Sequence, residues 1–478
     1  MDTTGSKNII RDIMWYLLGS AIPMTIAFIR SPIYTRIFSP EDYGYYTLAF
    51  ITFNYLSLVF FSWLSGCVWR YYNQFKKEKK LNTLITGIVQ LFVLSSIILG
   101  LLTIIWYGMI HNELFHKLVL LSFFYYLTNE LIVLLFINVK LEGKAKLYNL
   151  LISFKSSLAF LLLLLMTFKL NYGIEAFLSS TIIMNGLLII GYIIWLGKKS
   201  FLNFFQIDIP VLKLLINYGG VGIILNLSLL ILVNSDRYFI QWFDKIEHVG
   251  IYNQIYNLGQ ISVSALINVF MAAINPSLLH EYENNLKGSN SITNYYIRIF
   301  IYMFLPLTIY FSLFSKQLST VLLGEKFRVG YPMIPYIMVS SFLYGLVLFN
   351  EIKLKFANSF RRIIILFLVS GLINIVLNLL LIPEFGYQVA AVTTLIAYFI
   401  LFTGFYFSDS NQYFKDHGIQ QLLLRILPVV LLQCLLDVIL RKIIHLDINV
   451  ILSVLEALLF LIIYILYTRK LRISLFKQ

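Results

Sequence analysis

Residues 35–50 read TRIFSPEDYGYYTLAF, and a related stretch, QWFDKIEHVGIYNQIY, occupies residues 241–256, 206 positions further along the chain. Gly44 of the first stretch pairs with Gly250 of the second. Two more matches have similar offsets and join residues 171–176 to 384–389, and Asn129-Glu130 to Asn350-Glu351. Self-similarity at such a long period is typical of duplicated transporter folds. The repeat therefore predicts two equivalent halves.

The composition is that of a membrane protein. The chain has 478 residues, of which 59% are hydrophobic and 13% are charged, and its mean hydropathy is +0.81. A water-soluble fold of this length cannot bury so much apolar surface, so a soluble enzyme is excluded. A bilayer core of about 30 Å needs roughly 20 apolar residues per helix. Fourteen segments meet this need, at about 12–37, 43–68, 82–107, 115–138, 147–169, 174–196, 214–240, 249–275, 294–315, 332–356, 363–383, 387–407, 422–443 and 448–468.

The positive charges indicate an orientation for these helices. With the N-terminus in the cytoplasm, 26 of the 37 Lys and Arg residues fall on cytoplasmic segments, as the positive-inside rule requires. The apolar run that follows Arg11 continues past Ala27 with no small-residue cleavage site, so we expect a first membrane helix rather than a signal peptide. Both termini are therefore expected in the cytoplasm.

The repeat and the spans together predict an all-α integral membrane protein with two pseudo-symmetric six-helix lobes, residues 1–200 and 214–407. Six is an even number, so the lobes share one topology and the substrate path is expected between them. Residues 201–213 are expected to form an interfacial linker, because three phenylalanines stand beside a pair of lysines there. Residues 408–478 add two helices outside the repeat.

The sequence carries no pattern typical of catalysis or of metal binding. It contains no Walker motif, no HExxH and no nucleophile elbow. The connections between the spans are too short for a folded extramembrane domain. Cys67 and Cys434 both lie in apolar stretches, so neither a disulfide framework nor a cysteine metal site is expected. We expect a protein that is not an enzyme and has no bound cofactor.

Charged residues inside the spans are candidate functional residues, because each costs about 2.5–3.5 kcal/mol at the bilayer centre. The positive ones, Arg30, Lys155 and Arg237, are candidates for binding an anionic substrate. Snorkelling to the headgroups would equally account for Arg30 and Lys155. Asn226 lies about three helical turns before Arg237 and is expected on the same face. Asn226 and Asn234 are further substrate-binding candidates, although hydrogen bonds between helices would explain them as well.

The buried carboxylates, Glu130 and Asp236, are candidates for coupling transport to a proton or sodium gradient. Glu130 has an alternative explanation as the structural ion-pair partner of Lys155. Asn374 and Asn378 share one helical face and would either bond across the bundle or line the path. The excess of buried positive charge favours a phosphate or pyrophosphate as the group that is bound.

Several short motifs, taken in order, carry a resemblance to a known family. They are Tyr34 to Tyr46, Leu64-Ser65-Gly66 leading to Arg70-Tyr71, Asp236-Arg237, Val249-Gly250-Ile251-Tyr252, and Asn378 to Gly386 ahead of Ala390-Ala391. On these residues the whole chain resembles the O-antigen and capsule-repeat flippases of the multidrug, oligosaccharidyl-lipid and polysaccharide exporter superfamily. The resemblance implies that a two-lobed bundle moves an undecaprenyl-pyrophosphate-linked oligosaccharide across the bacterial cytoplasmic membrane by alternating access.

The resemblance also bears on the candidate residues and on the alternatives. Related flippases have a cationic central cavity, and Arg30, Lys155 and Arg237 match it by position and charge. The alternatives are a lipid II or teichoic acid exporter and a cation-coupled multidrug exporter. Drug exporters often have a carboxylate in helix one, whereas this chain has no Asp or Glu between Asp12 and Glu41. The expected partners are the lipid-linked substrate, membrane lipids and polysaccharide assembly proteins, and no nucleic acid.

Overall fold

The protein is helical throughout the part of the chain that the structure describes. This computed structural model describes residues 22–196, 207–284, 290–408, 413–439 and 450–475, and no strand occurs in these ranges. Twelve of the described helices are long and apolar enough to span a membrane. Two further helices, which cover residues 22–34 and Val450–Leu475 (α18), lie outside this set of twelve. The prediction of an all-α integral membrane protein is confirmed.

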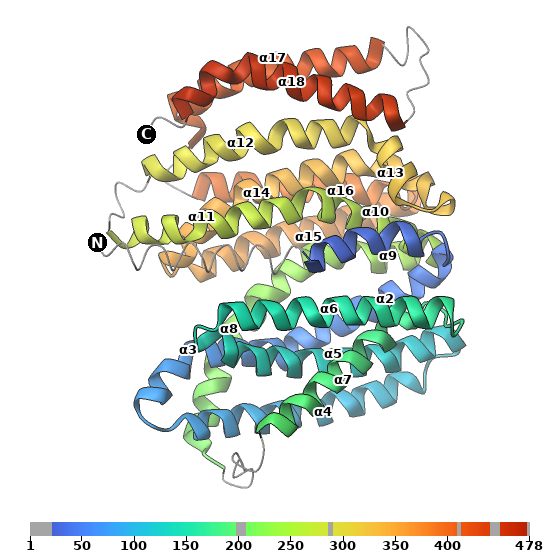
Figure 1. Ribbon diagram of the computed structural model, residues 1–478, viewed down its shortest axis with the longest axis vertical. Coiled ribbons are helices and arrows are strands. Elements are labelled where there is room, and N and C mark those ends of the chain that lie inside the picture. The colour runs from blue at the N-terminus through green and yellow to red at the C-terminus, as the bar shows by residue number, and fades with distance from the viewer. Residues whose placement is uncertain (1–21, 197–206, 285–289, 409–412, 440–449, 476–478) are drawn as a thin grey trace. The chain divides into compact units, whose positions relative to one another are not determined.

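The contacts divide the chain into two units, and the first contains the described residues up to Arg30 together with Phe38–Asn234. Its second span is a continuous helical rod in which a π-helical turn, Leu58–Ser62, joins two α-helices. The α-helices of this unit, coloured blue to green in Figure 1, are α2 (Pro40–Ser57), α3 (Trp63–Lys77), α4 (Leu81–Tyr107), α5 (Glu113–Leu141), α6 (Ala145–Phe168), α7 (Ala176–Leu196) and α8 (Ile209–Asn234).

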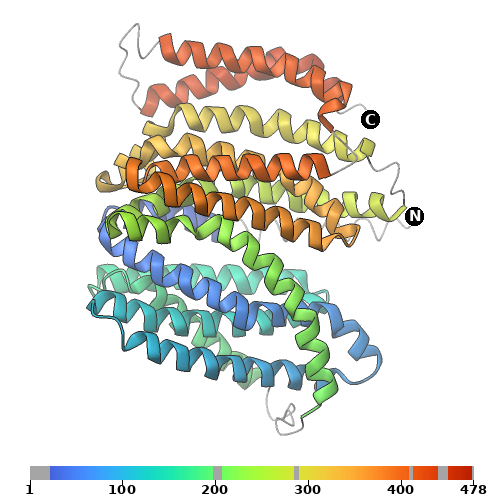
Figure 2. The same cartoon turned by 180° about the vertical axis from the view of Figure 1, so that it is seen from behind.

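The second unit contains Ser31–Ile37 and the chain from Ser235 onward. Its helices are α9 (Asp236–Phe243), α10 (Ile246–Gly259), α11 (Ala265–Asn284), α12 (Asn290–Leu313), α13 (Ser315–Leu322), α14 (Ile334–Phe356), α15 (Phe360–Phe385), α16 (Val389–Ser408), α17 (His417–Val438) and α18. The last two lie side by side, in red in Figures 1 and 2, and both pack against α12.

The acidic turn of the repeat motif, Ser39 to Asp42, starts α2 by capping it. The Ser39 hydroxyl accepts a hydrogen bond from the Asp42 amide at 3.1 Å, and the Asp42 carboxylate accepts one from the Ser39 amide at 3.0 Å. Pro40 occupies the first turn, where its missing N–H costs nothing. This capping box satisfies two amides that would otherwise lack partners at the helix start. The motif therefore fixes where the second span begins.

Two π-helical turns lie in spans that correspond under the repeat. One is Leu58–Ser62 in the second span, and the other is Gln260–Ser264 in the eighth. They are 202 positions apart, close to the offset of 206 between the quoted stretches. A π turn inserts one extra residue into a helix and is often found at functional sites. The agreement adds a structural match to the sequence repeat, while the lobe boundaries stay a prediction.

The expected seventh helix, residues 214–240, is interrupted at Ser235. Its first part, α8, begins at Ile209 and packs on α3 and α4, whereas α9 packs on α10 and α15. The interruption is one residue, Ser235, whose dihedral angles stay helical, and it falls where the chain passes from the first unit to the second. Residues 209–213 of the expected linker form the first turns of α8, and residues 201–206 lie outside the described residues.

Candidate functional site

A cavity of about 260 Å³ in the first unit contains two of the three predicted cations. Arg30 reaches it from the helix over residues 22–34, and Lys155 reaches it from α6. Asn129, Ser156 and Thr181 add polar groups to the wall. Among the described residues that line this cavity there is no aspartate or glutamate. The cavity is therefore positively charged, as the sequence led us to expect of a substrate site.

Aromatic side chains from the repeat motif hold Arg30 in place. Its guanidinium lies 5.1 Å from the centre of the Phe177 ring, near the start of α7. The Phe177 ring in turn packs on Tyr43 and Tyr46, with ring centroids 6.0 and 5.4 Å away. A cation over an aromatic face gains about 0.5–1 kcal/mol at an exposed site. The Tyr-Gly-Tyr-Tyr motif thus supports the surface on which Arg30 rests.

The Lys155 ammonium makes no direct ion pair with the Glu130 carboxylate. This corrects the explanation of Glu130 as the structural ion-pair partner of Lys155. The Lys155 ammonium donates instead to the Asn129 side-chain oxygen at 3.0 Å. The Glu130 oxygen Oε1 accepts hydrogen bonds from Ser57 at 2.9 Å and Ser62 at 3.3 Å. These two serines flank and end the π-helical turn of the second span. The turn brings both hydroxyls to one carboxylate oxygen, and Lys155 interacts with this carboxylate electrostatically without a direct ion pair.

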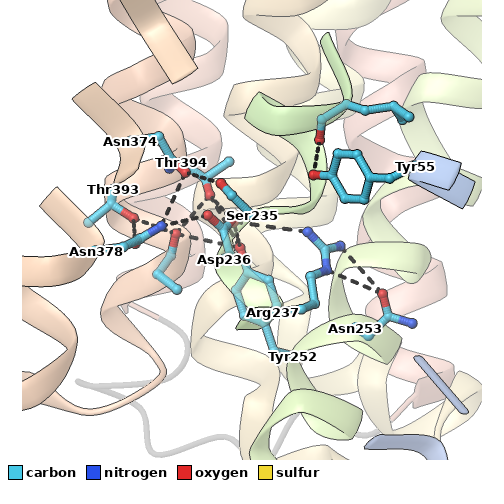
Figure 3. Close-up of polar contacts among 12 residues, drawn as sticks. Tyr55, Ser235, Asp236, Arg237, Tyr252, Asn253, Asn374, Asn378, Thr393 and Thr394 are labelled. Carbon is cyan, nitrogen blue, oxygen red and sulfur yellow. Dashed lines mark hydrogen bonds and ion pairs between the residues drawn. The ribbon is translucent and has the colours of Figure 1, made fainter. Parts of the chain in front are cut away.

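The second unit buries a polar cluster around Asp236, whose side chain has no exposed surface. Figure 3 shows side chains from α10, α15 and α16 converging on this carboxylate. Oδ2 accepts hydrogen bonds from the Tyr252 hydroxyl at 2.5 Å and the Thr394 hydroxyl at 2.8 Å. Oδ1 accepts one from the Asn378 amide at 2.7 Å. Three neutral donors therefore hold the carboxylate in one position.

Asn374 and Asn378 extend the cluster along one face of α15. The Asn378 amide donates to the Asn374 oxygen at 3.1 Å, and the Ser235 hydroxyl donates to the same oxygen at 3.2 Å. The Asn378 oxygen accepts a hydrogen bond from Thr393 at 2.5 Å. The two asparagines therefore bond across the bundle, which is one of the two uses that the sequence left open.

Arg237 is buried beside this cluster, with 1% of its side chain exposed. Its guanidinium lies 4.2 Å from the centre of the Tyr256 ring and 5.0 Å from that of Tyr252. Nε and Nη2 both lie 3.4 Å from the Asn253 oxygen, and Nη1 lies 4.0 Å from Asp236 Oδ2. Arg237 therefore lies beside the buried carboxylate and against two tyrosine rings, and its role in substrate binding stays a prediction.

The two asparagines of α8 belong to the first unit, whereas Arg237 belongs to the second. Asn226 is exposed, and its amide donates to the Gly222 carbonyl of the same helix at 3.0 Å. Asn234 is half-buried and is the last residue of α8. The helical face that Asn226 and Arg237 were expected to share stays a prediction. Their role in substrate binding stays a prediction.

Sequence reasoning missed the hydroxyl donors to Asp236. Tyr252 belongs to the Val-Gly-Ile-Tyr motif, which indicated the family but not the contact. Thr394 follows Ala390 by one helical turn, so a search for polar residues on the small-residue face of α16 would have found it. Ser57 and Ser62 were missed because a serine in an apolar span usually bonds to its own helix.

Comparisons with known proteins agree with this architecture. Residues 9–280 match the family described as polysaccharide biosynthesis protein. An uncharacterized membrane protein of Methanocaldococcus jannaschii is 23% identical over 428 residues, which cover 82% of each chain. A structure described as lipid II flippase MurJ, inward closed conformation, is similar with a TM-score of 0.72 and 16% identity, over 97% of this chain and all of that one.

Two structures described as multidrug resistance MATE family transporters of the MOP superfamily also share the fold. An inward-facing MATE transporter matches with a TM-score of 0.62 and 14% identity, over 85% of this chain and 98% of its own. An outward-facing one matches with a TM-score of 0.57 and 16% identity, over 87% and 96%. At such low identity these likenesses show the fold alone.

Proposed function

This chain belongs to the polysaccharide biosynthesis protein family, and from that premise we propose that it moves an undecaprenyl-pyrophosphate-linked oligosaccharide from the cytoplasmic to the outer leaflet of the bacterial cytoplasmic membrane. The movement is alternating access without a chemical step. Both termini lie in the cytoplasm, and polysaccharide assembly proteins are the partners that receive the product. The family membership and the lipid II flippase among the similar folds support a lipid-linked substrate.

The observation that carries the proposal is the cavity that Arg30 and Lys155 share. Two cations face one space of about 260 Å³, and no carboxylate is among the described residues that line it. A diphosphate group balances such a pair of charges with strong, charge-assisted hydrogen bonds. Arg and Lys are also the residues that proteins use most for phosphates. The polar wall near Asn129 and Ser156 suits the first sugar, while the polyprenyl tail stays in the lipid.

The same cavity argues against the drug-exporter alternative. A cationic drug would meet like charge at Arg30 and Lys155, which repels rather than binds it. The lipid II or teichoic acid alternative has the same headgroup chemistry, since those lipids also carry phosphates. The two remaining possibilities therefore differ in the sugar part, which the cation pair does not recognise.

We further propose that Asp236 couples transport to a proton or sodium gradient. Its carboxylate stands among the hydroxyls of Tyr252 and Thr394, and Thr394 also contacts the Ala390 carbonyl at 2.8 Å. Carboxylate, hydroxyl and carbonyl oxygens are the ligands that hard cations prefer. Glu130 is the corresponding candidate in the first unit, where two serine hydroxyls could exchange for an ion or a proton.

Complementation of bacterial strains tests the substrate class. We expect the protein to restore surface polysaccharide to a strain that lacks its own repeat-unit flippase. Arg30→Ala and Lys155→Ala should lower this export at least about tenfold, because each removes a charge that binds the diphosphate. Lys117→Ala is the matched control, since Lys117 is exposed and pairs with Glu113 at 2.7 Å. It should export normally.

The outcome also separates the alternatives. Normal export by both cavity variants would refute the assignment of the cavity. Rescue of a strain depleted of its lipid II flippase, without rescue of the repeat-unit flippase strain, would replace the oligosaccharide by lipid II as the substrate. Drug resistance on overexpression, with no effect on surface polysaccharide, would support the multidrug exporter instead.

A further inference from the structure

A second cavity of about 260 Å³ lies in the first unit, between α3, α5 and α6. Its wall contains Trp69, Lys140 and Tyr148, none of which the proposed function uses. The wall is otherwise mostly apolar, and no aspartate or glutamate is among its described residues. We name this space the Lys140 cavity. It combines aromatic surface with positive charge at one end of the helices.

The ammonium of Lys140 stands between the two aromatic rings. Its nitrogen lies 5.2 Å from the centre of the Trp69 ring and 5.4 Å from that of Tyr148. Lys140 is in the last turn of α5, and Tyr148 is in the first turn of α6. The rings hold the charge over the cavity by cation–π attraction. They also present flat apolar faces with polar edges, which suit a sugar ring beside an anion.

The Lys140 cavity adjoins the cavity that contains Arg30. Lys155 and Ser156 line both spaces, so they stand at the junction. Lys155 bonds to Asn129, which precedes Lys140 by eleven residues along α5. At about 1.5 Å per residue Asn129 and Lys140 lie at levels of α5 roughly 16 Å apart. This separation is about half of the bilayer core, which is about 30 Å thick.

The cations of the first unit therefore form a series along the membrane normal. Lys140 lies at the end of α5, Lys155 lies near the middle of α6, and Arg30 lies beside Phe177 at the start of α7. Each adjacent pair in the series lines a common cavity. A single diphosphate can thus pass from one cation to the next without being left unpaired in a medium where an isolated charge is very costly.

We propose that the Lys140 cavity is a second binding site for the diphosphate headgroup of the lipid-linked substrate, from which Lys155 passes the headgroup to the cavity of Arg30. This inference rests on the proposed function and adds a site and an order of steps to it. Lys140 binds the phosphate oxygens, and Trp69 and Tyr148 stack on the adjoining sugar. In the expected orientation the Lys140 end faces the cytoplasm, so this site is filled first.

Titration of the purified protein with farnesyl diphosphate tests the site directly. Lys140→Gln should raise the dissociation constant about tenfold, because it removes a charge-assisted contact to phosphate. Lys140→Arg should bind like the wild type, since it keeps the charge. Lys144→Gln is the matched control, because Lys144 is four residues away, is exposed and pairs with Glu142 at 2.7 Å. It should change the constant by less than about twofold.

Transport kinetics in vesicles test the order of steps. Lys140→Gln should raise the substrate concentration for half-maximal transport about tenfold and leave the maximal rate within about twofold, because it weakens loading only. Lys155→Gln should lower the maximal rate, because that residue takes part in the transfer. Thermal unfolding of each variant shows whether the protein is intact, and Lys140→Met, which also removes the charge, keeps the test valid if Lys140→Gln does not fold.

Different outcomes refute this site and the proposed function. If Arg30→Gln weakens farnesyl diphosphate binding while Lys140→Gln and Lys140→Arg both bind like the wild type, the second site does not exist and the proposed function stands. Equal binding of farnesol, weakened equally by Lys140→Gln, would also refute the site, because farnesol has no phosphate. If the wild type binds no farnesyl diphosphate at all, both proposals fail.

Discussion

Thr35 and Gly324 are joined by a hydrogen bond across 289 positions of the chain, since the Gly324 amide donates to the Thr35 hydroxyl oxygen at 2.8 Å. Arg36 adds a second contact by donating from Nη2 to the Val321 carbonyl at 3.0 Å. A β-carbon on Gly324 would lie 2.0 Å from the Thr35 carbonyl oxygen. This clasp therefore ties residues 31–37 to the end of α13 within the second unit, and it requires a glycine.

Gly324→Ala should destabilise the protein by about 1–3 kcal/mol, because the backbone of Thr35 must move to admit a methyl group. The measurement is thermal unfolding in detergent. Gly186→Ala is the control, since a β-carbon there would meet nothing within 4 Å, and helix propensity favours alanine over glycine. An unfolding temperature for Gly324→Ala equal to that of the wild type would show that the clasp adds no stability.

Removing the side chain of Arg237 should show how far the buried Asp236 carboxylate depends on the charge of the Arg237 guanidinium. Arg237→Leu leaves a fully buried carboxylate without its nearby guanidinium, which should cost about 3–5 kcal/mol. The double variant with Asp236→Asn should recover most of that loss, because no uncompensated charge remains. The yield of folded protein and its unfolding temperature measure both effects. Equal losses in the single and double variants would mean that Arg237 stabilises the fold only through its aromatic contacts.

The coupling proposal predicts that Asp236→Asn inserts and folds but no longer responds to an ion gradient. The amide keeps the shape of the side chain and removes the charge that an ion would balance. The stimulation of transport in vesicles by an imposed sodium or proton gradient should fall at least about tenfold in this variant. Glu130→Gln is measured beside it as the equivalent change in the first unit. Stimulation that persists in both variants would refute Asp236 and Glu130 as the coupling sites and leave the substrate assignment intact.

The spans could be predicted from the sequence because hydropathy acts locally. Residues 363–383 were expected as a helix and lie within α15, and residues 387–407 were expected as a helix and match α16 to within two residues at its start and one at its end. The break at Ser235 could not be predicted in this way, because the polar residues Asn234 to Arg237 that surround it do not by themselves end a helix. It depends on which helices pack against each part of the chain, and that is a long-range property.

The partners of the buried charges were only partly predictable. Adjacent residues on a helix point about 100° apart, so Asn129 and Glu130 offer Lys155 two very different directions. Which of them accepts a hydrogen bond from Lys155 depends on Ser57 and Ser62, whose hydroxyls donate to the Glu130 carboxylate from the π turn. No pattern within one helix reveals such a choice. The asparagines of α15 were recognised as polar partners, but their link to Asp236 spans 142 positions.

The paired π turns, Leu58–Ser62 and Gln260–Ser264, also bear on the history of the molecule. An extra residue in a helix rotates everything after it by about 100° relative to everything before it. If such an insertion occurred independently in each half, the residues that face lipid and those that are buried would have had to change twice, once in each span. An ancestor with six helices that already carried the insertion needs only one such event. If the predicted two-lobe repeat arose by duplication, the irregular turn is older than that duplication.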